Sequence, residues 1–301
     1  MSTRKAVLAA PPIVIRKPRT LSGVLAWMTG RGVLHLALIL ISVIWLAPSF
    51  GLAVTSFRER SDISSSGWWT AFSSWNFTIQ NYAEVLGAQG MGKSFLNSLM
   101  ITIPATILPV LIGSLAAYGF AWIRFPGRDW VFLAVVAMLV IPIQMTFVPV
   151  LRILNSLNLT QSYVGIWLAH TAYGLPFAIF LLRNFFVLLP GELIEAARLD
   201  GASNLGIFFR VILPLSVPAL ASLTIFQFLG VWNDLLMSLV FIQSQDLRPL
   251  TVGISQLLST YGTEWHLLSA GAFILMAVPL IVFFSLQRYF VQGLLAGSTK
   301  G

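Results

Sequence analysis

The first stretch that could do chemistry is "GAQGMGKS", Gly87 to Ser94, which satisfies the phosphate-binding pattern G-x-x-x-x-G-K-[ST] in full. In such a loop, backbone N–H groups cradle phosphates, the lysine adds a positive charge and the hydroxyl reaches magnesium. The pattern needs a strand before it and a helix after it in an α/β domain, whereas the residues after Ser94 open a long apolar run. We therefore interpret it as a glycine turn before a membrane helix and not as a nucleotide site.

Other catalytic patterns are absent from the sequence. No serine stands in a G-x-S-x-G turn, and no H-E-x-x-H pair is present to hold zinc. The three histidines, His35, His170 and His266, are scattered. The chain contains no cysteine, which excludes disulfides and thiolate metal sites. We predict a protein that is not an enzyme, with no catalytic residue, no metal site and no cofactor of its own.

The composition of the chain indicates that its structural elements lie in a membrane. Of the 301 residues, 57% are hydrophobic and 9% are charged, whereas a soluble domain carries about 25% charged residues. The apolar residues stand in runs of about 20, the length that a helix needs to cross a bilayer core about 30 Å thick. We predict an all-α integral membrane protein with one domain, 34–292, and six transmembrane helices at about 34–56, 96–120, 130–151, 163–187, 214–240 and 267–290.

The basic residues predict the orientation of the chain. A basic leader, 1–33, precedes an apolar run longer than the roughly 7–15 residues of a signal peptide, so we interpret that run as an uncleaved span. With the N-terminus inside, thirteen lysines and arginines fall at inner positions and five at outer ones, as the positive-inside rule expects. Both termini, including a tail at 293–301, are then cytoplasmic. The net charge of +8 follows from this topology and indicates no nucleic-acid partner.

Five polar residues in the predicted spans are candidates for a transport path. A charge at bilayer mid-depth costs about 2.5–3.5 kcal/mol on insertion scales, so a carboxylate there must face protein or water. Each residue has an alternative role, because polar side chains in membrane helices also link neighbouring helices or cap helix ends. The candidates are Gln144, His170, Gln227, Asn233 and Asp234.

Small residues and prolines predict how the spans pack and bend. Gly113 and Ala117 stand four apart, a spacing that lets helices approach closely. Pro142 and Pro176 fall inside the third and fourth predicted spans, where the missing N–H bends a helix. We therefore expect close packing at the second span and bends in the third and fourth.

A charged, turn-rich stretch interrupts the apolar sequence on the predicted cytoplasmic side. It reads "ELIEAARLDGASNLGIFFRVILPLSVPAL", from Glu192 to Leu220. Proline at 190 suits the start of a helix, and the two glutamates then fall in its first turns, where negative charge is favoured. Gly201 suits a left-handed helix end and Ser203 suits the cap of a second helix. The pattern predicts a short helix, a tight turn and another short helix.

This helix–turn–helix has the features of a docking surface. A small apolar face recurs at near-helical spacing beside the charged residues, and it consists of Leu193, Ala196, Ala197 and Leu199. Such a helix suits a groove on another protein, whereas a DNA-binding helix–turn–helix would not stand between two bilayer spans. We predict that the stretch binds a partner protein.

The same stretch resembles the EAA motif of permease subunits in bacterial ABC importers. The resemblance rests on Glu195-Ala196-Ala197, Gly201, Val211, Leu213 and Pro214, with valine where the family prefers isoleucine. Elsewhere, "AAYGFAWIRFPG" (116–127), "VWND" (231–234) and "GLLAGSTKG" (293–301) resemble the smaller permease of the maltose-type carbohydrate importers. The stretch "SGWWTAF" (66–72) resembles members that handle α-glucosides or glucosylglycerol.

The resemblance implies a type I ABC importer permease fold in the bacterial cytoplasmic (inner) membrane. It implies a second permease subunit, an extracytoplasmic sugar-binding protein and two ATPase subunits, which would hold the ATP and magnesium. It implies an ATPase-coupling segment at 188–214, with Glu192, Glu195, Ala196, Ala197, Asp200, Gly201, Leu213 and Pro214. The residues that reach toward the binding protein would be Ser259, Thr260, Tyr261, Gly262, Thr263 and Glu264, and the tail at Ser298–Gly301 would touch the ATPase pair.

The alternative is a gradient-driven secondary transporter or channel without an ATPase. Such a protein would be expected to carry more intramembrane acids or an inverted repeat, whereas Asp234 is the one such acid in the sequence and no repeat is evident. The predicted cargo of the importer is an oligosaccharide, an α-glucoside or a glucosylglycerol-like sugar. We expect a neutral sugar, because no basic residue is well placed inside the spans to hold an anionic group.

Overall fold

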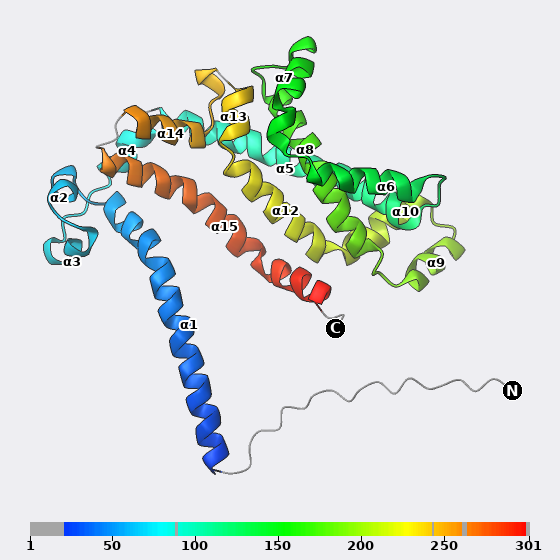
Figure 1. Cartoon of the computed structure of the whole chain (residues 1–301), viewed down its shortest axis with the longest axis horizontal. Helices are drawn as coiled ribbons and strands as arrows, with labels where there is room; N and C mark the ends of the chain where they lie inside the picture. Colours follow the sequence, from blue (N-terminus) through cyan, green and yellow to red (C-terminus); the bar gives the residue numbers. More distant parts are fainter. Residues whose placement is uncertain (1–20, 88–89, 243, 261–263, 299–301) are drawn as a thin grey trace. The chain divides into compact units, whose positions relative to one another are not determined.

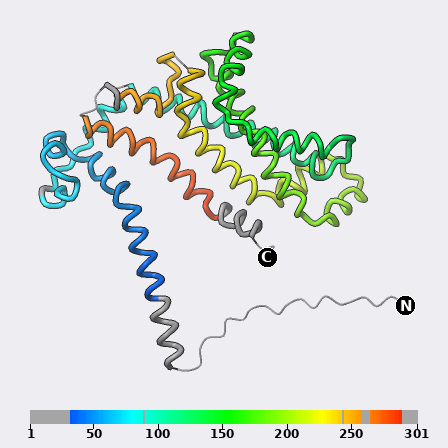
Figure 2. The backbone as a smooth tube through the Cα atoms, viewed as in Figure 1, coloured from blue at the N-terminus to red at the C-terminus, as the bar shows by residue number. Residues whose placement is uncertain are grey.

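Helices are the regular elements of the computed structural model, which describes residues 21–87, 90–242, 244–260 and 264–298 (Figures 1 and 2). The chain divides into two compact units, Met1–Leu52 and Ala53–Gly301. Helix α1 (Leu21–Ser56) supplies the described part of the first unit. Its large apolar side chains between Val33 and Leu46 are exposed, with Trp45 at 78%. An apolar surface of that extent is typical of a helix that lies in a membrane or against another protein.

Four of the described helices are long and apolar enough to cross a bilayer. They are residues Gly32–Ser56 of α1, α5 (Met91–Trp122), α8 (Tyr163–Phe186) and residues Trp265–Arg288 of α15 (Trp265–Ser298). Two bent helix pairs, 128–156 and 204–232, bring the number to six if each pair forms one span. Helix α8 continues through Pro176, where the sequence predicted a bend.

The third predicted span, 130–151, is two segments rather than one helix. Helix α6 (Arg128–Ala137) and a 3₁₀ turn (Met138–Val140) end before Pro142. A second 3₁₀ turn (Ile143–Thr146) then leads into α7 (Phe147–Ser156), and the two halves meet at 99°. The bend predicted at Pro142 is confirmed, because proline lacks the N–H that would continue the helix.

The fifth predicted span, 214–240, is also interrupted. The chain enters through α11 (Leu213–Leu215) and forms α12 (Val217–Trp232), with a bend of 79° between the preceding helical stretch and α12. After α12 the backbone leaves the helical path and resumes in α13 (Leu236–Phe241). Asp234 lies in this break, not within a continuous helix.

The long helices of the second unit pack through small residues. Helix α5 contacts α8 and α12, and α12 contacts α15 (Figure 1). Gly113 of α5 is buried against Ala178 of α8, and a Cβ on Gly113 would lie 2.7 Å from the Ala178 Cβ. The close packing predicted for the second span is therefore confirmed. Gly174 of α8 similarly leaves room for the Gln227 side chain of α12.

One end of the second unit carries short helices arranged around Arg58. They are α2 (Arg60–Ser65), a 3₁₀ turn (Trp68–Thr70), α3 (Ala71–Ser74) and α4 (Gln80–Leu86), and α14 (Leu250–Thr260) lies in the later connection before α15. Arg58 is 2% exposed, and its guanidinium donates hydrogen bonds to the Asp62 and Ser66 carbonyls, the Ser66 hydroxyl and the Thr70 hydroxyl. These bonds replace the water that a buried cation loses.

Candidate coupling segment and transport path

The stretch predicted to dock a partner begins with a complete helix and a left-handed turn. Helix α9 (Gly191–Leu199) starts one residue after Pro190. Gly201 has φ +77°, so the predicted left-handed end is confirmed. The Ala202 N–H donates to the Ala197 carbonyl at 3.0 Å and the Gly201 N–H to the Arg198 carbonyl at 3.0 Å. This pair of bonds is a Schellman motif, which satisfies the last carbonyls of the helix.

A second short helix follows the turn. Ser203 Oγ accepts a hydrogen bond from the Gly206 N–H at 3.1 Å, which confirms the predicted cap of α10 (Asn204–Ile207). The next five residues, Phe208–Ile212, form one π-helical stretch before α11. Leu213 and Pro214, the last two predicted coupling residues, belong to α11, with the leucine half-buried and the proline exposed.

The segment has one buried side and one exposed side. Ile194 is 1% exposed, and it joins Ile207, Phe208 and Ile212 in a core that also contains residues of α5, α8 and α12. Most of the predicted apolar face points away from this core, and Leu199 is 89% exposed. Ile194, which anchors α9 in this core, was not among the residues predicted from the sequence. It lies on the side of α9 opposite the exposed Leu199. A leucine this exposed on a rigid helix is available to a partner.

Hydrogen bonds join α9 to the ends of two long helices. Arg198 Nη2 donates to the carbonyl of Trp122, the last residue of α5, at 3.2 Å. Trp122 Nε1 in turn donates to the carbonyl of Phe186, the last residue of α8, at 3.1 Å. The ring of Tyr118 also packs against Phe208, with centroids 5.5 Å apart. Helix α9 is therefore hydrogen-bonded to the end of α5, and the last side chain of α5 to the end of α8.

The remaining predicted coupling residues lie on the exposed side. Glu192, Glu195, Ala196 and Asp200 are exposed, as is Gly201, whereas Ala197 is half-buried against the core. The structure thus brings the α9 members of the set together on one surface. None of the exposed carboxylates forms an ion pair with a described residue.

The predicted path residues have different surroundings. Asp234 Oδ1 accepts from the Met237 N–H at 3.2 Å, and its Oδ2 accepts from the Ser238 N–H at 3.0 Å and the Ser238 hydroxyl at 3.2 Å. Asp234 therefore caps α13, and its own carbonyl accepts from the Thr251 hydroxyl at 2.8 Å. Asn233 is exposed and donates to the Leu229 carbonyl at 2.9 Å.

The other three path candidates lie on separate elements. His170 of α8 is 5% exposed and interacts electrostatically with the charge of Asp234, while its Nε2 has no hydrogen-bond partner among the described residues. Gln227 packs over Gly174 and donates to the Ala105 carbonyl at 3.4 Å, so it links α12 to α8 and α5. Gln144 is exposed in the bend between α6 and α7.

The residues predicted to meet a binding protein lie at the end of the unit that carries the short helices. Ser259 and Thr260 end α14, and Tyr261, Gly262 and Thr263 lie outside the described residues. Glu264 is held by Arg60, with Oε1 2.5 Å from Nη2, and by His266, with Oε2 3.5 Å from Nδ1. Its side chain is 14% exposed, so this carboxylate is largely buried as well as paired.

The described residues of the phosphate-binding pattern lie at this same end of the second unit. Gly90 has φ +67° and precedes the first residue of α5, and no strand stands before it among the described residues. Lys93 Nζ forms an ion pair with Asp246 Oδ1 at 2.5 Å. The hydrogen bond from Lys93, and then its charge, lower the pKa of the Asp246 carboxyl below 3.8.

The Lys93–Asp246 ion pair predicts that the stability of the fold depends on pH. A lowered folded-state pKa gives stability that is present above the ordinary value of 3.8 and is lost as the pH falls through the lower folded-state value. We expect Asp246→Asn to lower the thermal unfolding temperature in detergent slightly at pH 7, because both partners are exposed. The difference from wild type should shrink as the pH falls below 3.8 and vanish only below the folded-state pKa of Asp246, and Lys93→Gln should give the same profile. A difference that stays constant from about pH 7 to about pH 2 would contradict this assignment.

Comparisons with known proteins agree on one family. The sequence model described as "Binding-protein-dependent transport system inner membrane component" matches residues 109–295. The chain is 53% identical over 274 residues to the osmoprotective compounds uptake permease protein of Synechocystis sp., covering 89% of this chain and 91% of that protein. It is 53% identical over 231 residues to the alpha-glucoside transport system permease protein of Rhizobium meliloti, covering 75% of this chain and 61% of that protein.

The fold also matches a solved structure. A chain of a bacterial ABC transporter involved in the import of the acidic polysaccharide alginate superposes with a TM-score of 0.71. The match covers 86% of this chain and 96% of that chain, at 21% sequence identity. At that identity the likeness concerns the fold, which is that of an ABC importer permease.

Proposed function

This chain belongs to the family of binding-protein-dependent transport system inner membrane components, and from that premise we propose that it passes a neutral sugar through the bacterial inner membrane. The sugar is an α-glucoside, a glucosylglycerol-like compound or an oligosaccharide, delivered by an extracytoplasmic binding protein. A second permease completes the pathway, and two ATPase subunits hold and hydrolyse ATP. The name of the Rhizobium meliloti relative, an alpha-glucoside transport system permease, supports this cargo class, and the Synechocystis relative is named for the uptake of osmoprotective compounds.

The observation that carries the proposal is that α9 is buried on one side and exposed on the other. The anchor, Ile194, holds the helix on the ends of the long helices, and Leu193 and Leu199 present apolar surface to a partner. When an ATPase subunit moves, the helix moves with it, and the Arg198–Trp122 and Trp122–Phe186 hydrogen bonds pass that motion to α5 and α8. A gradient-driven transporter would have no use for such a surface.

The proposed orientation puts the α9 segment and both termini in the cytoplasm. The end that carries α2, α4 and α14 is then extracytoplasmic and faces the binding protein. Within the path, Gln144 and Asn233 are exposed and available to sugar hydroxyls. Asp234 and Gln227 instead hold the helices that shape the path.

The experiment that tests the function is a gentle detergent purification of the tagged chain from its native host. We expect a second permease and an ATPase subunit to copurify, and a sugar-loaded binding protein to stimulate ATP hydrolysis. Uptake in a deletion strain should be lost for neutral α-glucosides and retained for anionic sugars. A chain that purifies alone without ATPase activity would support the gradient-driven alternative. An uptake defect confined to anionic substrates would refute the proposed cargo class.

A matched pair of variants separates the two sides of α9. Ile194→Ala removes buried atoms and is expected to destabilise the protein by about 2–5 kcal/mol, as a cavity in a packed core does. Leu199→Ala should leave thermal unfolding unchanged, because the side chain is 89% exposed. It should weaken ATPase association about tenfold, since truncating an apolar contact that docking buries costs roughly 1–2 kcal/mol. Full ATPase retention by Leu199→Ala would show that this side does not dock.

A further inference from the structure

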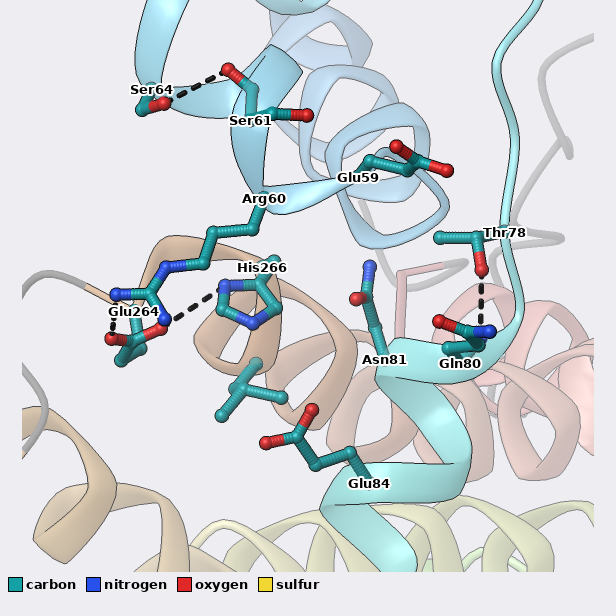
Figure 3. A pocket seen from close by; sticks show the side chains of 11 residues that line it. Glu59, Arg60, Ser61, Ser64, Thr78, Gln80, Asn81, Glu84, Glu264 and His266 are labelled. Carbon is teal, nitrogen blue, oxygen red and sulfur yellow. Dashed lines mark hydrogen bonds and ion pairs between the residues drawn. The ribbon is translucent and has the colours of Figure 1, made fainter.

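A polar cavity of about 820 Å³ opens at the end of the second unit opposite α9 (Figure 3). Three segments that are distant in the sequence line it. They are the start of α2, from Glu59 to Ser64, the chain around α4, from Thr78 to Glu84, and the start of α15, from Glu264 to Leu267. None of the coupling or path residues described above lines it, whereas Glu264, predicted to reach toward a binding protein, does.

The cavity has more negative than positive charge. Arg60, the one arginine among the described residues that line it, is paired with Glu264 at 2.5 Å, and His266 also lies against Glu264. Glu59 and Glu84 are exposed, and neither side-chain carboxylate forms an ion pair or hydrogen bond with a described residue. Two carboxylates are therefore left to attract a cation into the cavity.

A buried amide provides a fixed acceptor between these two carboxylates. Asn81 is 4% exposed, and its Nδ2 donates to the Ser56 carbonyl at 2.9 Å and the Arg58 carbonyl at 2.8 Å. These two bonds fix the orientation of the amide. Its Oδ1 accepts no hydrogen bond from a described residue, and Figure 3 shows the oxygen turned toward the side where His266 lies. This oxygen is therefore the acceptor that Asn81 offers at the wall of the cavity.

We propose that this cavity receives a lysine or arginine side chain of the extracytoplasmic binding protein. The expected occupant is a cation with several N–H donors, because Glu59, Glu84 and the Asn81 oxygen all line the cavity as acceptors. A neutral sugar has no charge to pair with the two unpaired carboxylates, so these favour a cation over a sugar. The inference rests on the proposed function, which makes this end of the unit extracytoplasmic.

The test uses the complete importer reconstituted in nanodiscs with its own ATPase subunits, partner permease and sugar-loaded binding protein. ATP hydrolysis is measured against binding-protein concentration for wild type, Glu59→Gln/Glu84→Gln and Glu84→Gln. We expect the double variant to raise the half-saturating binding-protein concentration about tenfold, with the maximal rate unchanged. That half-saturating concentration should also depend less on salt, because a charge pair has been removed.

Asp246→Asn is the matched control for Glu84→Gln, because it neutralises one exposed carboxylate at the same end and outside the cavity. An equal shift for both single variants, or no shift for the double variant, would overturn the proposal. Thermal unfolding of each variant checks that the exposed substitutions leave the fold intact. If wild type itself shows no stimulation by the binding protein, the proposed function fails, and that result is distinct from a failure of the cavity alone.

Discussion

Gly201→Asp is expected to reduce sugar uptake at least tenfold while the chain still inserts and assembles. The backbone at Gly201 has φ +77°, and a Cβ there would meet no atom within 4 Å. The intramolecular cost is therefore the left-handed conformation alone, about 1–2 kcal/mol for most L residues and less for Asp. A carboxylate at this exposed turn would be buried without a partner when an ATPase subunit docks. Uptake of radiolabelled sugar and copurified ATPase activity, measured on the same preparation, check the result.

Two other variants separate backbone strain from docking. Gly127→Asp is the matched control, since Gly127 has φ +76° and a Cβ there also meets nothing within 4 Å. Gly127→Asp should transport at near the wild-type rate. Gly201→Asn should retain more transport than Gly201→Asp, because asparagine accepts the left-handed conformation and adds no charge. Equal losses for the Gly127 and Gly201 variants would assign the defect to folding.

Gly113→Leu is expected to prevent accumulation of folded protein. A Cβ at this position alone would stand 2.7 Å from the Ala178 Cβ, closer than two carbon atoms can pack. Leucine adds three further carbons between α5 and α8, which together form a core of the second unit. Overpacking of this kind costs roughly 1–3 kcal/mol or more, and the two helices can relieve it only by separating. Membrane accumulation and thermal unfolding in detergent measure the effect.

Exchanging the small residues at positions 113 and 178 tests whether their contact causes the loss of stability. Gly113→Ala should lower thermal stability, and adding Ala178→Gly should restore part of it, because the next atom of Ala178 lies 3.6 Å away. Glycine within α8 costs about 1 kcal/mol of helix propensity, so the recovery should be incomplete. If the double variant is less stable than Gly113→Ala, the clash with Ala178 is not what limits the packing.

Local patterns in the sequence predicted local structure well. The left-handed turn at Gly201 and the cap at Ser203 follow from backbone sterics and from one side-chain hydrogen bond. Both depend only on residues within a few positions, which the sequence displays. The apolar runs likewise predicted the membrane class and a helical fold, because bilayer thickness sets the length of a spanning helix.

Features that depend on distant contacts were not predictable in the same way. The interruption around Asp234 is stabilised by Thr251 from a later element, so hydropathy alone extended the fifth span through it. Ile194 and Leu199 are both apolar, and only the packing of α9 on the long helices shows that one is buried and the other exposed. The hydrogen-bonded environment of Arg58 has no signature in the sequence, because its partners are carbonyls and hydroxyls that any loop contains.

The bonds from Arg198 to Trp122 and from Trp122 to Phe186 limit the independent motions of this permease. An isolated helix end can fray or tilt freely, because its last carbonyls bind water. Here the terminal carbonyl of α5 is bound by α9, and that of α8 is bound by the last side chain of α5. Three helix ends are thus joined by two hydrogen bonds. In the proposed transport cycle, we expect a movement of the smallest of the three, α9, to shift the ends of α5 and α8 with it.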